Sequence, residues 1–162
     1  MNLKKGRILG IDPGTGILGF GIIDTDESNQ PKLVDAGVIR TTPDRSDAER
    51  LADIQTDLEQ IINEFKPSSM AVEKLFFAQN ITTAMTVSQA RGVVLALGAR
   101  AGLEVFEYTP LQIKQALTSY GRATKNQMQE MVKVILKLQS IPKPDDCADA
   151  LAAAITHLMT VR

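Results

Sequence analysis

The sequence predicts an α/β domain in which helices cover both faces of a mixed β-sheet. Three segments rich in apolar and β-branched residues, at about 7–12, 17–24 and 33–40, are separated by turn residues and indicate an antiparallel meander of three strands. Helical and strand patterns then alternate, which favours further, parallel strands. With 162 residues, 44% of them hydrophobic, the chain can form one sizeable core, and we expect a single domain over residues 1–162.

Hydrophobic spacing places the later elements. Between Arg45 and Phe65, apolar residues recur at helical intervals, and Lys66-Pro67 ends that helix. A fourth strand is expected at about 69–74. The remaining predicted elements are a helix from Asn80 to Arg100, a fifth strand from Leu103 to Tyr108, helices from Pro110 to Leu117 and from Lys125 to Leu138, and a last helix at about 145–160.

An aspartate lies at the mouth of the first predicted hairpin. Asp12 ends the apolar run of the first strand and is followed by Pro13-Gly14, which interrupts the strand. A carboxylate at this position costs sheet stability, which favours a functional role. Asp-Pro-Gly is also a common turn in which the Asp side chain accepts hydrogen bonds, and the motif alone does not distinguish the two roles.

Three further acids follow a comparable pattern. Glu73 ends the apolar run of the fourth predicted strand, so it lies beside Asp12 if the first and fourth strands are neighbours. In the last helix, Asp146 and Asp149 are three residues apart and can address one site. Asp149 has small apolar neighbours and needs a cation, a metal or a hydrogen-bond donor. The helix dipole alone explains an acid in the first turn, but it explains Asp149 less well.

A cluster of carboxylates needs a cation to offset its internal repulsion. Oxygen ligands with no supporting histidine or thiol are typical of Mg²⁺, with Mn²⁺ as a substitute. Two such ions can activate a water molecule and stabilise the leaving oxygen of a phosphoryl displacement. The acids therefore predict metal-dependent phosphodiester chemistry.

Charge is distributed unevenly along the chain, although the formal net charge is only -1. Residues 1–90 carry 9 Lys and Arg against 13 Asp and Glu, whereas residues 91–143 carry 8 against 3. This segregation favours a phosphate-binding face beside a metal site. Solvated lysines on a helical surface would give the same pattern.

The sequence shows no sign of a membrane or an oxidising compartment. No uncharged apolar stretch reaches the length of a membrane span, and the apolar stretch near the N-terminus ends at Asp12, too early for a secretory signal. The one cysteine, Cys147, cannot form an internal disulfide. We therefore expect a cytoplasmic protein.

Five segments, in this order along the chain, resemble the RuvC family of crossover junction endodeoxyribonucleases. They are 10–15, 71–76, 88–92, 105–108 and 146–152, and the similarity extends from about Ile8 to His157. The resemblance implies an RNase H-like fold and a homodimer. It also implies Mg²⁺-dependent, symmetric nicking of four-way Holliday junctions that leaves 5′-phosphate and 3′-hydroxyl ends, and a branch-migration motor of the RuvA and RuvB type as a partner.

The resemblance assigns the metal ligands. The acidic quartet of the family falls on Asp12, Glu73, Asp146 and Asp149, with two Mg²⁺ ions expected per site. Asp145 is an alternative to Asp146, because its spacing of four from Asp149 also suits one helix face. The alignment of the Asp-Ala-Leu-Ala motif favours Asp146.

The resemblance also assigns three DNA contacts. Lys114 and Lys125 match basic positions near the scissile phosphate and the DNA backbone, and Phe76 matches an aromatic that stacks on a base near the junction centre. Phe77 is interpreted as a packing residue, since large apolar side chains are usually buried. His157, two helical turns beyond Asp149, is interpreted as structural.

Assembly and substrate leave alternatives. The helix at Asn80 to Arg100 is apolar around more of its circumference than one sheet contact requires, which predicts a twofold dimer through this helix. Burial of the whole helix within its own core is the alternative. For the substrate, the alternative is an RNase H-like nuclease acting on structured RNA or another branched nucleic acid. The intact quartet argues against a third reading, a junction-binding module without catalysis.

Overall fold

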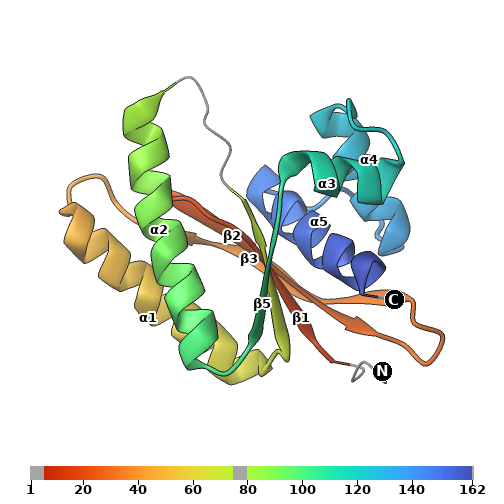
Figure 1. The fold of residues 1–162 in the computed structure, drawn as a ribbon, viewed down its shortest axis with the longest axis horizontal. Coiled ribbons are helices and arrows are strands. Elements are labelled where there is room, and N and C mark those ends of the chain that lie inside the picture. The colour runs from red at the N-terminus through yellow and green to blue at the C-terminus, as the bar shows by residue number, and fades with distance from the viewer. Residues whose placement is uncertain (1–5, 75–79, 162) are drawn as a thin grey trace.

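A computed structural model describes residues 6–74 and 80–161 and shows one five-stranded sheet with helices on both faces (Figure 1). Its strands lie in the order β3-β2-β1-β4-β5. The first three pair antiparallel, whereas β4 runs parallel to both β1 and β5. The mixed sheet and its meander are therefore confirmed. The strands are β1 (Ile8–Asp12), β2 (Ile17–Thr25), β3 (Pro31–Arg40), β4 (Ser69–Glu73) and β5 (Glu104–Tyr108).

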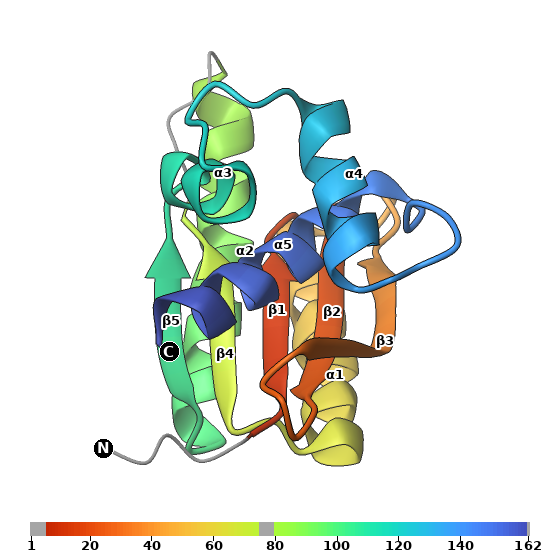
Figure 2. The ribbon, with the colours of Figure 1, turned by 90° about the vertical axis from the view of Figure 1, so that its right-hand side faces the viewer.

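The five described helices form two layers. Figure 1 shows α1 and α2 on one side of the sheet and α3, α4 and α5 on the other. In Figure 2, α5 crosses the sheet obliquely, with α3 and α4 above it. The helices are α1 (Asp47–Phe65), α2 (Ile81–Arg100), α3 (Pro110–Thr118), α4 (Lys125–Ile135) and α5 (Asp145–Thr160). None of them is both long enough and apolar enough to cross a lipid bilayer.

Two predicted helix boundaries were wrong. The first helix begins at Asp47 rather than Arg45, because the Ser46 side chain accepts from the Glu49 N–H while Glu49 accepts from the Ser46 N–H. The helix predicted to reach Leu138 ends at Ile135. There the N–H of Leu138 bonds the carbonyl of Lys133, five residues back, and Lys137 takes a left-handed backbone with φ 54°. Left-handed helix ends usually carry glycine, so the sequence did not reveal this one.

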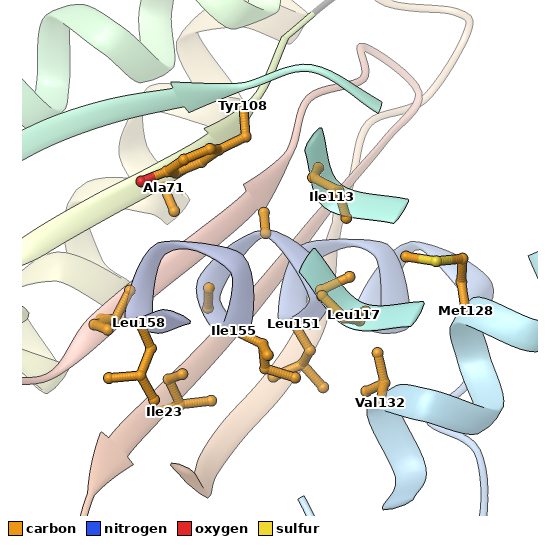
Figure 3. Close-up of a cluster of buried hydrophobic side chains, with 14 of the residues drawn as sticks. Ile23, Ala71, Tyr108, Ile113, Leu117, Met128, Val132, Leu151, Ile155 and Leu158 are labelled. Carbon is orange, nitrogen blue, oxygen red and sulfur yellow. The ribbon is translucent and has the colours of Figure 1, made fainter. Parts of the chain in front are cut away.

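Alternation along the strands divides the core between the two faces. In β1, Leu9 and Ile11 pack on the side of α1 and α2, whereas Ile8 packs on the side of α5. Figure 3 shows the core on the α5 side of the sheet, where α5 lies between the sheet and helices α3 and α4. Leu151 and Ile155 of α5 are fully buried there. Helix α5 is thus a core element that also begins near the strand ends.

Glycines allow α5 to lie directly on the sheet. A Cβ on Gly10 would fall 2.0 Å from the carbonyl oxygen of Ala150, and one on Gly19 would fall 2.1 Å from that of Asp146. Such distances leave no room for a side chain at either position. The absence of these side chains sets the depth at which the first turn of α5 sits against β1 and β2.

Candidate functional site

Sheet pairing brings two of the predicted acids together. Strands β1 and β4 are parallel neighbours, with Ile11 opposite Val72, and Asp12 and Glu73 are the next residues along them. Because Ile11 and Val72 both face α1 and α2, alternation turns the two following acids toward the α5 face. The expected adjacency of the first and fourth strands is confirmed.

Helix α5 supplies the other two acids. Asp146 lies in its first turn, and its carbonyl oxygen is the atom that Gly19 accommodates. Asp149 follows almost one turn later, and both residues are partly buried. The glycine contact therefore sets the distance between the acids of the helix and the acids of the strand ends.

The electrostatics of Asp12 show that all four carboxylates belong to one cluster. The pKa of Asp12 is raised to about 9. Burial is the largest cause, and the charges of Glu73, Asp149 and Asp146 and a hydrogen bond to Glu73 contribute the rest. At neutral pH and without a bound cation, Asp12 therefore holds a proton.

The pKa values of two other acids rise in the same way. Burial raises the pKa of Glu73, with the negative charge of Asp149 as the next cause. Burial also raises the pKa of Asp149, although the nearby ammonium group of Lys125 opposes the shift. Buried carboxylates that repel one another are the arrangement that a bound cation stabilises.

Lys125 lies against this cluster from α4. Its Nζ atom is 3.7 Å from Asp149 Oδ2 and 3.5 Å from Asp145 Oδ2. The charge of Asp149 is the main cause that raises the pKa of Lys125. A second lysine, Lys114 of α3, is near enough for its charge to lower the pKa of Glu73. The two lysines singled out in the sequence thus lie within electrostatic reach of the acids.

The geometry separates Asp146 from its neighbour Asp145. The charge of Asp146 contributes to the raised pKa of Asp12. Asp145 instead accepts a hydrogen bond from Lys143 Nζ at 3.0 Å, and that contact is the main cause that lowers its pKa. Asp145 therefore forms ion pairs with Lys143 and Lys125. The arrangement favours Asp146 as the fourth member of the quartet.

A pocket of about 300 Å³ opens beside Asp12 and Glu73. Its walls come from the ends of β1 and β4, from α2 and from the start of α3, and Lys125 is not among the residues that line it. The remaining lining residues are Pro13, Lys74, Val87, Arg91 and Pro110. Two of the acids therefore face a space that can admit part of a ligand.

The donor set suits a hard divalent cation. Among the residues that the structure describes, no three His, Cys, Asp or Glu side chains converge closely enough to enclose a metal ion. Charge interactions extend farther than coordination bonds, which for Mg²⁺ are about 2.1 Å long. The residues fit Mg²⁺ in chemistry, because four carboxylates supply oxygen ligands and their repulsion favours binding of a cation.

Other predicted residues fall outside the cluster. His157 is buried on α5, where its Nδ1 lies 2.8 Å from the Tyr108 hydroxyl and its ring lies over Phe106, so it is structural. Cys147 is buried as a free thiol. Phe76 and Phe77 lie outside the described residues, and the predicted stacking contact of Phe76 stays a prediction.

Comparison with known proteins agrees with this arrangement. The family profile described as Crossover junction endodeoxyribonuclease RuvC matches residues 8–157. The RuvC protein of Heliobacterium modesticaldum is 57% identical over 155 residues, which cover 94% of this chain and 95% of that protein. Five residue segments had suggested the same family.

Solved structures give the same result. The structure of Thermus thermophilus RuvC superimposes with a TM-score of 0.89 at 36% identity and covers 96% of this chain and 95% of that one. T. thermophilus RuvC in complex with a Holliday junction substrate gives a TM-score of 0.87 at 35% identity, with the same coverage. The RNase H-like fold is thereby confirmed, and the chain belongs to the RuvC family of crossover junction endodeoxyribonucleases.

Proposed function

We propose that this protein resolves four-way DNA junctions by symmetric, Mg²⁺-dependent nicking of two strands, with Asp12, Glu73, Asp146 and Asp149 as its metal ligands. The observation that carries the proposal is the shared electrostatics of acids from three separate elements, centred on the raised pKa of Asp12. Relatives named for crossover junction cleavage, and a related chain solved with a Holliday junction, support the choice of substrate.

Nucleases of the RuvC family depend on a metal, and we propose two Mg²⁺ ions for this site, because its four acids offer oxygen ligands. Bound there, the metal would supply an activated water molecule and stabilise the leaving oxygen of the phosphodiester. Asp12 and Glu73 hold their positions through the paired strands, and Asp146 and Asp149 through the buried helix α5. Lys125 contacts Asp149 from α4, and its ammonium group can attract a DNA phosphate there.

The direct test is cleavage of labelled synthetic substrates. We expect cleavage of a four-way junction at two symmetric positions with Mg²⁺, no cleavage with chelator, and none of a matched linear duplex. A structured RNA of equal length tests the alternative substrate. Cleavage of the RNA in preference to the junction would overturn the proposal and favour that alternative.

Substitution of the two lysines should weaken DNA binding in a salt-dependent manner. We expect Lys114→Ala and Lys125→Ala each to reduce the slope of log affinity against log salt concentration by about one, because each removes one phosphate contact. Junction binding in chelator, measured by fluorescence anisotropy at several salt concentrations, gives the slope. Lys32→Ala is a matched control, since Lys32 pairs with Asp24 in the sheet register, at the end remote from Asp12 and Gly19. If all three variants kept the wild-type slope, Lys114 and Lys125 would not contact DNA phosphates.

Helix α2 offers a surface for the proposed homodimer. Ile81 is 75% exposed and Met85 62% exposed, one turn apart. The stripe continues along the same side through Ser88, Gly92 and Ala96, all exposed, and a Cβ on Gly92 would meet nothing within 4 Å. The helix is therefore not buried wholly in its own core. A stripe of small and apolar residues at this spacing suits close packing against a twofold-related copy.

Charge introduced into this stripe should separate the subunits. We expect Met85→Glu to weaken dimerisation by roughly tenfold or more, because a carboxylate would be buried in an apolar interface. Sedimentation velocity across micromolar concentrations measures the change. Val134→Glu is the control, since Val134 is 63% exposed on α4. A Met85→Glu protein that sediments as the wild type would contradict the α2 interface.

The proposal extends to the cellular setting. Cleavage of a four-way junction consumes an intermediate of DNA recombination and repair, and a motor complex of the RuvA and RuvB type would move the branch point to sites that can be cut. Such an enzyme is expected in the cytoplasm.

A further inference from the structure

An arginine lines the pocket beside the acids without pairing with them. Arg91 and Val87, one turn apart on α2, both face the pocket that Asp12 and Glu73 also line. Lys125 approaches the acids from α4, which lies on the other side of the sheet (Figure 1). The acids are thus flanked by a cation on each side.

Glu107 of β5 holds Arg91 in place. Their side chains form an ion pair, with 21% of the Arg91 side chain and 33% of the Glu107 side chain exposed. In the sheet register Glu107 lies opposite Val72, the residue before Glu73. Because Glu107 and Val105 alternate with Phe106, they share the face that packs against α2. The pair therefore fixes the guanidinium group at the strand ends, where the acids also lie.

The guanidinium group retains unused donors. Its Nη2 faces Glu107, whereas its Nε is buried and has no hydrogen-bond partner among the described residues. Because the Nε is buried, a phosphate would meet the part of the side chain that remains exposed, 21% of its surface. Guanidinium groups present several donors in a plane and bind phosphate oxygens two at a time.

From these observations we infer that Arg91 binds a backbone phosphate of the DNA strand on the α2 side of the acidic site, and that Glu107 positions it. This inference rests on the proposed function, since it adds a contact to the same substrate. Lys74, the other cation of the pocket, is exposed and has no ion-pair partner within the described parts of the chain. Arg91 differs from Lys74 because Glu107 already holds its guanidinium group, which lowers the entropy lost when the phosphate binds.

The competing explanation is that the pair only ties α2 to β5. That role predicts a loss of thermal stability when either residue is changed, and no effect on DNA affinity once the protein is folded. Phosphate contact predicts a lower affinity and a smaller salt slope for folded protein. The two explanations therefore differ in a quantity that can be measured.

The experiment uses the full chain and a synthetic four-way DNA junction in chelator, so that binding is measured without cleavage. Arg91→Gln should bind about tenfold more weakly, with a salt slope reduced by about one. Arg91→Lys should keep the slope but bind more weakly, since it retains charge and loses paired donors. Arg100→Gln, at the exposed end of the same helix, is the control and should match the wild type.

Glu107→Gln tests the positioning role. It should lower kcat with Mg²⁺ while leaving the salt slope unchanged, because the phosphate-binding charge remains but is no longer fixed. A folded Arg91→Gln protein with wild-type affinity and slope would overturn the inference. If Arg91→Gln fails to fold, an Arg91→Lys protein with wild-type affinity and kcat would overturn it equally. Failure of the wild-type chain to bind the junction would instead refute the proposed function.

Discussion

Asp12→Asn is expected to abolish junction cleavage, by roughly 10³-fold or more, while junction binding stays intact or becomes tighter. The substitution removes a proposed metal ligand and also removes negative charge that repels phosphates. Single-turnover cleavage with Mg²⁺ and anisotropy in chelator measure the two effects. Glu73→Gln, Asp146→Asn and Asp149→Asn should behave alike.

Asp145→Asn is the matched control, because Asp145 pairs with Lys143 and Lys125 and does not contribute to the raised pKa of Asp12. If Asp145→Asn were inactive and Asp146→Asn active, Asp145 would be the fourth metal ligand in place of Asp146.

The same variant should show how the cluster depends on pH. The pKa of Asp12 is raised from 3.8 to about 9, so its stabilising contribution is complete below pH 4 and is lost as pH rises toward 9. Asparagine has no such titration. In chelator, the melting temperature of Asp12→Asn should therefore exceed that of the wild type by more at pH 8 than at pH 5. A difference that does not change with pH would show that the carboxyl is not protonated in the folded protein.

A single methyl group at Gly19 should disturb both the fold and the catalytic site. Gly19→Ala places a Cβ 2.1 Å from the carbonyl oxygen of Asp146, so the start of α5 must move. We expect a loss of about 1–3 kcal/mol in the free energy of unfolding. Cleavage should fall by roughly 10²-fold, because small displacements of catalytic groups are costly. Urea denaturation and single-turnover cleavage give the two values.

Gly16→Ala is the control in the same hairpin. A Cβ there would come no closer than 3.4 Å to the end of the Arg50 side chain, which is an ordinary contact. Stability and cleavage should therefore remain those of the wild type. A Gly19→Ala protein with full stability would mean that α5 can retreat from the sheet without cost.

Local pattern predicted most of the fold. Strand segments, turn residues and helical spacing each depend on a few neighbouring residues, so the order and approximate bounds of all ten elements followed from the sequence. The end of α4 did not follow, because Lys137 adopts a left-handed backbone that its residue type does not announce. A local bond from the Leu138 N–H to the Lys133 carbonyl closes that end, with Lys137 in the left-handed position that glycine usually takes.

The candidate site was predictable where acids interrupt apolar runs. Asp12 and Glu73 are conspicuous because each ends a buried strand, and family resemblance selected Asp146. Arg91 lies in one of the five family-like segments, but no role followed from that, since an arginine on a long helix is usually solvated. Its position beside the acids depends on how α2 packs across the sheet, and its partner Glu107 is sixteen residues away on β5. Only the folded arrangement joins them.

The central place of α5 links the proposed catalytic site to the order in which the chain is synthesised. Two of the four proposed ligands and the helix that fills one face of the sheet are translated after every described strand. A nascent chain that ends before Asp145 lacks two of the proposed ligands and also the buried Leu151 and Ile155, which hold the sheet to its outer helices. The proposed ligand set and the core on this face of the sheet are therefore completed by the same helix.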